Sequence, residues 1–528
     1  MMPRYVCSVD VGTGSARAGV FQADGQLLGR GVEPILLNRP SADYAEHDSE
    51  NIWQSVCKAV RAAVRAAGVK AQDIAGLSFD ATCSLVVRGR EGEPVSVSPG
   101  GDDRWDTIVW LDHRALAEAD QCSATGHEVL DFIGGTMSPE METPKLMWLK
   151  RHLPKSWERA GHFFDLADFL TWRASGSTER SQCTVTAKWT YLAHENEPWR
   201  RDFFEAVGIG DMLERGTVPP HAVPPGTDLG PLTAEAAEAL GLTQGCRVGA
   251  GLIDAFAGAL GVLGPYAGKP DELARQMALI AGTSSCVMTM ASEPKQLRGF
   301  WGPYYGTILP GLWLTEGGQS ATGALLDHVI RLHGAGGEPS ADMHQRIADR
   351  IDELRTVEDD LSPRLHVLPD FHGNRSPYAD SHALGVVSGL TLDASFDSLC
   401  RLYWRTAVGI ALGVRHILDT LNAHGHDIDT LHVTGGHTRN ALLMELYADA
   451  TGCAVIEPET DEAVLLGTAM IAAAACGLYP NLAEAATAMA RPARKRSANS
   501  ARAVRYERDY RVFLEMHKQR KALDEIGQ

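Results

Sequence analysis

The sequence lacks the patterns that mark several common protein classes. Its ten cysteines include no Cys-x-x-Cys pair and its histidines form no His-Glu-x-x-His motif, so neither a zinc ribbon, a thioredoxin-like site nor a structural zinc site is indicated. Basic residues are in deficit, with 49 Lys and Arg against 67 Asp and Glu, a formal net charge of −18. This balance argues against nucleic acid or an anionic membrane as a partner, although a local pocket could still hold an anionic ligand.

Long apolar runs are also missing. The longest, Val464 to Leu478, has about 15 residues rich in Ala and Gly, which is too short to span a bilayer and predicts a buried helix. The first residues, MMPRYVCSVDVG, show no charged region followed by an apolar stretch, so no secretory signal is predicted. We therefore expect a cytoplasmic protein with reduced thiols.

The length of 528 residues exceeds what one hydrophobic core supports. Single cores stop growing at roughly 250–300 residues, so two domains are expected. Gly and Pro interrupt the pattern between residues 262 and 275 and indicate a linker there. The expected domains are residues 1–265 and 266–528.

The chain opens with an antiparallel meander followed by an α/β order. Strands are predicted at residues 5–11, 16–22, 26–35, 74–79, 85–87 and 107–111. A helix is predicted at about 50–67, with Asp48 or Ser49 as its cap. The turn between the first two strands is Gly12-Thr13-Gly14-Ser15.

A similar unit returns in the second half. VDVGTGSARAGV and LIAGTSSCVMTM both read as strand, Gly-Thr-Ser turn and strand, about 270 residues apart, which indicates a duplicated domain. The second unit places strands at 277–281 and 286–290 around Gly282-Thr283-Ser284-Ser285. A strand at 431–433 and helices at about 439–451 and 463–475 follow.

The two Gly-Thr turns are candidates for phosphate binding. Either turn alone could be an ordinary hairpin, but converging backbone N–H groups and hydroxyls bind phosphate without a lysine, and the pairing favours that function. Asp10 ends an otherwise apolar strand directly before the first turn, where a carboxylate needs a charged partner. Magnesium carried in on nucleotide phosphates is one such partner. Arg17 could neutralise phosphate or pair with an acid.

Asp254 stands alone among small apolar residues in GAGLIDAFAGALG. Two interpretations stay open. It could cap a helix, a position that suits Asp. It could also be a partly buried general base that accepts the proton of an attacking hydroxyl in phosphoryl transfer.

Other polar residues are weaker candidates. The segments 80–84 (DATCS) and 110–114 (WLDHR) end predicted strands, where ligand crevices form in α/β sheets, but loop capping explains them equally well. Lys188 lies in TVTAKWTYL, a β-rich stretch, and reads as an edge-strand lysine or a substrate donor. Glu316 precedes a helix as a capping acid or a ligand contact, and Gly435-Gly436 with Asn440 could hold a nucleoside. The segment 370–377 reads as a loop of undetermined function.

Longer stretches carry a resemblance to a known family. DVGTGSARAGV, GLIDAFAG, AGTSS and TGGHTRN occur in the order and spacing of the FGGY carbohydrate kinases, and the resemblance covers essentially the whole chain. DATCSLV, WGPYYGTILPGLWLTEGGQSATG and LHVLPDFHGNRSPYAD resemble the D-ribulokinase branch. The resemblance implies an α/β fold of two ribonuclease-H-like domains around a central cleft, as in the actin/hexokinase/Hsp70-type ATPases. It also implies sugar mainly on the N-terminal domain and ATP mainly on the C-terminal one.

The same resemblance implies roles for individual residues. Asp254 would be the catalytic base and, with Asp10, a Mg²⁺ contact made partly through water. The sugar contacts it implies are Ala81, Thr82, Lys188, Asp254 and Glu316. The ATP contacts are Gly12, Thr13, Ser15, Arg17, Gly282, Thr283, Gln319, Gly435, Gly436 and Asn440. Many relatives have a third glycine where this chain has His437, so contact of His437 with the adenine stays open.

The function expected from this resemblance is ATP- and Mg²⁺-dependent phosphorylation of a ketopentose, D-ribulose to D-ribulose 5-phosphate. Ribitol, L-ribulose and xylulose are the alternative substrates. An actin-like or chaperone-like ATP switch, or a sugar sensor without turnover, are alternatives of another class. The solitary acid in GLIDAFAG and the lack of a C-terminal peptide-binding domain count against the switch. The partners are then a sugar and ATP, and a homodimer is the assembly to test.

Overall fold

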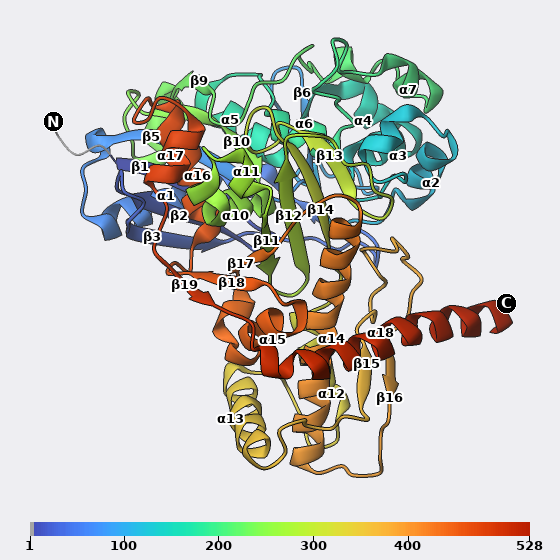
Figure 1. Ribbon diagram of the computed structural model, residues 1–528. Coiled ribbons are helices and arrows are strands. Elements are labelled where there is room, and N and C mark those ends of the chain that lie inside the picture. Colours follow the sequence, from blue (N-terminus) through green and yellow to red (C-terminus); the bar gives the residue numbers. More distant parts are fainter. Residues whose placement is uncertain (1–4, 528) are drawn as a thin grey trace.

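The computed structural model describes residues 5–527 as an α/β protein built on two main sheets (Figure 1). The first sheet has six strands in the order β3-β2-β1-β5-β10-β9. Its strands are β1 (Tyr5–Val11), β2 (Ser15–Phe21), β3 (Leu27–Pro34), β5 (Ile74–Ala81), β9 (Asp228–Pro231) and β10 (Arg247–Ile253). β1 to β3 form the predicted antiparallel meander, whereas β5 lies parallel to both β1 and β10.

The second sheet repeats this plan with seven strands in the order β13-β14-β12-β11-β17-β18-β19. Its strands are β11 (Gln276–Ala281), β12 (Ser285–Ala291), β13 (Trp301–Tyr305), β14 (Trp313–Gln319), β17 (Thr430–Thr434), β18 (Ala454–Pro458) and β19 (Ala493–Arg496). β11 is antiparallel to β12 and parallel to β17, as β1 is to β2 and β5. The predicted duplication is therefore confirmed in topology.

Two smaller sheets complete the strand inventory of residues 5–527. One, in the order β4-β7-β6-β8, consists of β4 (Glu46–His47), β6 (Leu85–Gly89), β7 (Thr107–Ile108) and β8 (Ala160–Asp165). The other pairs β15 (His366–Leu368) with β16 (Val386–Ser388). The predicted strand at 107–111 ends early because the N–H of Asp112 turns back to the carbonyl of Val109 (3.0 Å).

Helices cover the sheets on several sides (Figure 1). Those before residue 265 are α1 (Ser49–Ala67), α2 (Leu116–Ala124), α3 (Glu142–His152), α4 (Pro154–Arg159), α5 (Leu166–Ser175), α6 (Gln182–Lys188), α7 (Arg201–Ala206), α8 (Met212–Arg215), α9 (Ala234–Leu240) and α10 (Asp254–Leu263). Those after it are α11 (Pro270–Leu273), α12 (Gly323–Leu332), α13 (Ala341–Val357), α14 (Phe396–Ala423), α15 (Ala441–Thr451), α16 (Ala463–Ala475), α17 (Leu482–Ala488) and α18 (Ser500–Gly527).

Helix α1 shows why the local signals were reliable. The carboxylate of Asp48 accepts a hydrogen bond from the N–H of Asn51, and Gly68 ends the helix in the left-handed conformation (φ 67°). Ile52, Val56 and Val60 recur on one face and are buried. The predicted cap, start and end are confirmed to within one residue.

Helix α6 corrects the strand-like interpretation of the stretch around Lys188. Its N-terminus is capped by the hydroxyl of Ser181, which accepts from the N–H of Cys183, and its β-branched Thr184, Val185 and Thr186 are buried. The helix packs against β10 and β13. Tertiary packing therefore overrides the local β preference of these residues.

Helix α16 is the buried helix predicted from its small residues. Although it comes late in the chain, it packs on β1, β5 and β10 of the first sheet and on α10 (Figure 1). The predicted linker at 262–275 is mostly helical, since it holds the end of α10, a 3₁₀ turn (Gly264–Tyr266) and α11. Because α16 returns to the first sheet, the division of the chain at residue 265 stays a prediction.

Two further expectations concern the whole chain. Within residues 5–527, no helix is long and apolar enough to cross a bilayer. No disulfide joins any of the ten cysteines within residues 5–527. The absence of a secretory signal was predicted partly from residues 1–4, which lie outside the described range.

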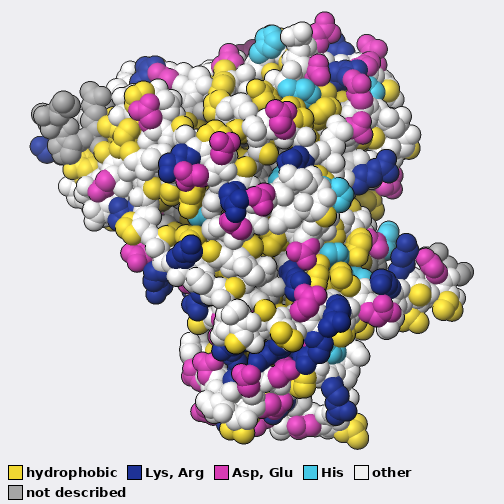
Figure 2. Space-filling model, viewed as in Figure 1, with side chains coloured by type: hydrophobic (Ala, Val, Ile, Leu, Met, Phe, Trp, Pro, Cys, Tyr) yellow, Lys and Arg dark blue, Asp and Glu magenta, His cyan; other side chains and the backbone are white. Residues whose placement is uncertain are grey.

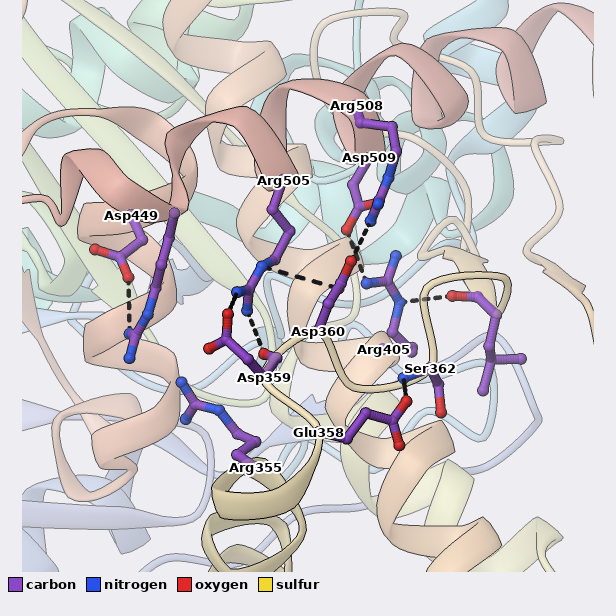
Figure 3. Close-up of polar contacts among 12 residues, drawn as sticks. Arg355, Glu358, Asp359, Asp360, Ser362, Arg405, Asp449, Arg505, Arg508 and Asp509 are labelled. Carbon is purple, nitrogen blue, oxygen red and sulfur yellow. Dashed lines mark hydrogen bonds and ion pairs between the residues drawn. The ribbon is translucent and has the colours of Figure 1, made fainter.

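Helix α18 lies across the second half and extends beyond the body at its end (Figure 1). Polar contacts attach it to α14, α15 and the loop after α13 (Figure 3). The central one joins Arg405 of α14 to Asp509 of α18 (2.8 Å), with both side chains almost fully buried. Nε of Arg405 also donates to the carbonyl of Leu365 (2.5 Å).

This buried ion pair generates a stability prediction. Asp509→Ala leaves the Arg405 guanidinium without its carboxylate, so we expect the free energy of unfolding to fall by about 3–5 kcal/mol in urea titrations. Asp359→Ala is the control, because the carboxylate of Asp359 pairs with Arg505 in an exposed position and should matter little. Equal losses in the two variants would contradict this account of how α18 is held.

Candidate active site

A cavity of about 350 Å³ lies between the two halves of the protein. Segments before residue 265 contribute Arg17, Thr82, Lys188 and Asp254 to its wall. Segments after it contribute Gly282, Thr283, Glu316, Gly435 and Gly436. The volume suits a small-molecule ligand, and nine of the residues singled out from the sequence share this one space.

Asp254 begins α10 directly after β10. Its Oδ1 accepts a hydrogen bond from the N–H of Ala255 (2.7 Å), while the side chain is partly exposed to the cavity. Burial raises the pKa of Asp254, and the charges of Arg17 and Lys188 act in the opposite direction. Asp254 is not the helix cap that one interpretation expected, since Ile253 holds the N-cap position and no side chain caps α10. Its carboxylate borders the cavity, and its role as general base stays a prediction.

Each Gly-Thr loop is closed by a backbone hydrogen bond, although the accepting residue differs between the two. In the first (residues 12–15) the N–H of Gly12 donates to the carbonyl of Ser15 (3.1 Å), and in the second (residues 282–285) the N–H of Gly282 donates to the carbonyl of Ser284 (2.9 Å). Each loop follows the carboxyl end of an inner strand, β1 or β11. The second loop lines the cavity directly, whereas Thr13 accepts a hydrogen bond from Nε1 of Trp110 (3.0 Å), a cavity residue.

Gly435 allows the third loop to approach the second. Its φ of 92° favours glycine, and a Cβ there would lie 2.5 Å from the carbonyl oxygen of Ala281, at the end of β11. Any side chain at this position would push the loop after β17 away from the second Gly-Thr loop. Glycine at position 435 is thus required for the shape of the cavity wall.

A buried acidic pair lies beneath the first loop. Asp10 and Asp80 are direct neighbours on the parallel strands β1 and β5, and both are fully buried. Arg17 forms an ion pair with Asp10, and Oγ1 of Thr468 donates to Oδ2 of Asp80 (2.5 Å). Burial raises the pKa of Asp10 to about 7, against the effect of Arg17, and raises that of Asp80 well above its usual value.

These carboxylates fit a role in holding magnesium. Oδ1 of Asp10 and Oδ1 of Asp80 are buried without a hydrogen-bond partner in the described structure, whereas Oδ2 of Asp10 forms the ion pair with Arg17. No group of three or more His, Cys, Asp or Glu within residues 5–527 could hold a metal ion. Mg²⁺ commonly binds through one or two carboxylates, with phosphates and water as its other ligands.

The other end of the cavity carries two cations and two acids around one tryptophan. Nζ of Lys188 lies 4.0 Å from Oε2 of Glu316 and 4.7 Å from the ring centre of Trp301. The guanidinium of Arg375 lies 5.2 Å from the same ring centre and 3.7 Å from Oε1 of Glu140. Burial alone would lower the pKa of Lys188, but the Glu316 carboxylate raises it, so the ammonium stays charged.

Seven predicted contacts lie away from the cavity wall. Four belong to the first Gly-Thr loop and the strand before it: Asp10, Gly12, Thr13 and Ser15. The other three are Ala81, Gln319 and Asn440. Ala81 is fully buried at the end of β5. Nε2 of Gln319 donates to the carbonyl of Ile410 (3.2 Å). Asn440 caps α15 by accepting from the N–H groups of Leu442 and Leu443. In this conformation these last three side chains serve the fold.

Sequence reasoning missed Glu140, Trp301 and Arg375. Arg375 lies in the segment whose function stayed undetermined, and its Gly and Pro content did mark a loop of the kind that carries function. Trp301 begins WGPYYG, which served only as evidence for the family branch. No local pattern indicated that Glu140 would meet Arg375.

Comparisons with known proteins agree with this geometry. Residues 5–261 match the N-terminal domain of the FGGY family of carbohydrate kinases, and residues 277–476 match its C-terminal domain. An FGGY carbohydrate kinase domain-containing protein of Danio rerio is 43% identical over 98% of both chains, and one of Homo sapiens is 40% identical over 97% of this chain and 96% of its own. A D-ribulokinase of Saccharomyces cerevisiae is 34% identical over 89% of this chain and 72% of its own.

Solved structures share the fold. A gluconate kinase from Lactobacillus acidophilus superposes with a TM-score of 0.82 at 18% identity, covering 98% of both chains. A xylulose kinase from Rhodospirillum rubrum gives 0.80 at 23% identity, covering 98% of this chain and 99% of its own. The α/β fold with two sugar-kinase-type domains is thereby confirmed. The chain belongs to the FGGY family of carbohydrate kinases, enzymes that phosphorylate sugars with ATP.

Proposed function

We propose that this carbohydrate kinase converts D-ribulose and ATP into D-ribulose 5-phosphate and ADP, with Mg²⁺. The observation that carries the proposal is the position of Asp254, which shares one cavity with the Lys188–Glu316 pair and with the second Gly-Thr loop. The choice of D-ribulose is supported by the similarity to a yeast D-ribulokinase and by the segment DATCSLV.

Asp254 acts as the general base. Its carboxylate accepts the proton of the sugar O5 hydroxyl as that oxygen bonds to the γ-phosphorus. The bond from the γ-phosphorus to the bridging oxygen breaks, and ADP leaves with the electron pair. The raised pKa of Asp254 makes it a better proton acceptor than an ordinary aspartate.

The sugar lies against Lys188, Glu316 and Thr82. A ketopentose has no charge, so recognition depends on donors and acceptors, and a site built to bind hydroxyls rejects analogues that lack them. The ammonium of Lys188 donates to sugar oxygens, and the carboxylate of Glu316 accepts from hydroxyls. Arg375 supports this end of the cavity through Trp301 and Glu140.

We place the phosphates of ATP between the two Gly-Thr loops, with Gly12, Thr13 and Ser15 on one side and Gly282 and Thr283 on the other. Gly435 and Gly436 contribute to the nucleoside end. Asp10, with Asp80 beside it, and Asp254 hold the magnesium ion, in part through water. When bound, magnesium offsets the negative charge that gathers on the phosphates during transfer.

Four broader proposals accompany this function. Residues 1–265 form the sugar side and residues 266–528 form the ATP side. α16 is the exception, because it belongs to the second range but packs on the first sheet. The protein is placed in the cytoplasm, where thiols stay reduced. Acidic and basic side chains intermix on the surface in view, which offers no broad basic patch for nucleic acid there (Figure 2). A homodimer is the assembly that a sedimentation experiment should test.

Asp254→Asn tests the base assignment. Because the amide cannot accept the hydroxyl proton, we expect kcat to fall by about 10²–10⁴-fold, with ATP affinity close to that of wild type by calorimetry. Asp48→Asn is the control, since Asp48 caps α1 and has no place in the cavity wall. Wild-type turnover by Asp254→Asn would refute the assignment.

Parallel steady-state assays test the substrate. We expect D-ribulose to give a higher kcat/KM than ribitol, L-ribulose or xylulose, because the site must match the hydroxyl geometry as well as the carbonyl. A higher value for any of the three would move the assignment to that sugar. ATP hydrolysis coupled to assembly or peptide binding, without sugar phosphorylation, would favour an ATP switch.

Arg375→Met tests the sugar end of the cavity. The substitution keeps apolar bulk beside Trp301 but removes the guanidinium near Glu140 and Glu316, so we expect the KM for sugar to rise roughly 10-fold. The KM for ATP should change little. Arg331→Met on α12 is the control, because Arg331 is half-exposed outside the cavity wall. An unchanged KM for sugar in Arg375→Met would remove Arg375 from the substrate site.

A further inference from the structure

Each Gly-Thr loop is contacted by a buried histidine from outside its own hairpin. Nε2 of His47 lies 3.1 Å from the carbonyl oxygen of Thr13 in the first loop. Nε2 of His437 lies 3.0 Å from the carbonyl oxygen of Gly282 in the second. His47 belongs to β4 and His437 to the turn after β17. Each half thus contacts a carbonyl of its loop through a different element, at Thr13 in the first loop and at Gly282 in the second.

The partners fix the tautomer of His437. A backbone carbonyl can only accept a hydrogen bond, so Nε2 must carry the proton. Nδ1 lies 2.8 Å from the hydroxyl of Tyr447 and, being unprotonated in the neutral ring, accepts from it. Burial lowers the pKa of this imidazole to about 4, so the ring is neutral near pH 7.

The carbonyl of Gly282 receives two other hydrogen bonds. The N–H of Gly323 donates to it (3.0 Å), and so does Oγ1 of Thr322 (3.1 Å). The carbonyl oxygen of Gly282 thus accepts from Thr322 and Gly323 at the start of α12 and from His437 in the turn before α15. The Gly282 carbonyl belongs to the same peptide unit as the N–H of Thr283, a residue of the cavity wall.

His47 contacts the first loop at the Thr13 carbonyl, and fewer hydrogen bonds hold its ring than hold that of His437. Its ring is fully buried, burial lowers its pKa to about 4, and Nδ1 has no hydrogen-bond partner in the described structure. Burying a polar atom such as this Nδ1 without a hydrogen-bond partner is energetically unfavourable, which points to a role for the ring beyond packing. The Thr13 carbonyl belongs to the same peptide unit as the N–H of Gly14. The hydrogen bond from His47 therefore acts on a peptide unit whose N–H belongs to the loop, as the bond from His437 does.

We propose that His47 and His437 are positioning residues that hold the two Gly-Thr loops and strengthen their N–H groups as donors to the phosphates of ATP. The proposal rests on the phosphate-binding role given to these loops above. A hydrogen bond to a carbonyl polarises its peptide unit, and donors fixed before the ligand arrives need no reorganisation. His437 acts on the loop in the cavity wall, and His47 on the loop beside Asp10.

The two histidines have different kinetic signatures. Losing the His437 hydrogen bond should raise the KM and the Kd for ATP about five-fold, the effect of one net hydrogen bond, with the KM for sugar within two-fold of wild type. Losing the His47 contact loosens the loop beside the transferred phosphate, so kcat should fall about five-fold.

The experiment compares His437→Leu with His437→Gln and His47→Leu with His47→Gln. The Gln amide can still donate to the loop carbonyl and should restore most of the lost function. His432→Leu is the matched control. His432 is buried in β17, the strand that precedes His437, and it contacts Gln276 (2.9 Å) rather than a Gly-Thr loop. Thermal midpoints show which variants fold. Tyr447→Phe provides a milder second route, since it removes only the hydroxyl that fixes Nδ1 of His437.

Long-range ¹H–¹⁵N spectra of the free protein give a readout independent of turnover. We expect both rings as the neutral tautomer protonated at Nε2, and a ring protonated at Nδ1 would overturn the proposal for that histidine. An unchanged Kd for ATP in His437→Leu, or an equal change in His432→Leu, would also overturn it for His437. Failure of the wild type to bind ATP would instead refute the proposed function, and the two failures are thus distinct.

Discussion

The arrangement of the two halves depends on the close contact between α10 and α16. A Cβ at Gly261 would lie 2.0 Å from the carbonyl oxygen of Ala463, and one at Gly467 would lie 2.0 Å from that of Ala257, so any side chain would force the helices apart. α10 starts at Asp254, and the start of α16 forms part of the cavity wall. The same helix donates from Thr468 to Asp80. One backbone contact therefore sets the position of the base, the cavity wall and the acidic pair together.

Much of the fold was predictable because its signals are local. The meander, the Gly-Thr turns and α1 depend on residues within a few positions of each other, and their limits agree with the structure to within one or two residues. The duplicated unit was visible as a repeated pattern, and the two sheets repeat its topology. Asp254 had two interpretations from the sequence. The helix cap is not found, because Asp254 is the first residue of α10 and Ile253 is its N-cap, and the general base stays a prediction.

What the sequence could not predict depends on residues far apart in the chain. Lys188 reads as part of a strand until β10 and β13 are placed beside it. Arg375 and Glu140 meet only because the loop after β15 folds over the cavity. The histidine in place of a third glycine was noticed, but its contact with Gly282 depends on two loops from different strands. Local patterns hold no information about such pairings, whereas the packing of the sheets determines them.

The charged side chains of the cavity are arranged differently at the end proposed to bind the sugar and at the end proposed to bind the phosphates. At the sugar end, Lys188 and Arg375 each lie near an acid, so an uncharged ligand meets donors and acceptors without a net field. At the proposed phosphate end, Arg17 is already paired with Asp10, and the N–H groups of Gly12 and Gly282 are bonded within their own loops. The proposed Mg²⁺ would therefore supply positive charge that these groups do not provide. We infer that the protein's own charges select the sugar, while the geometry of the loops, held from behind by His47 and His437, orients the phosphates.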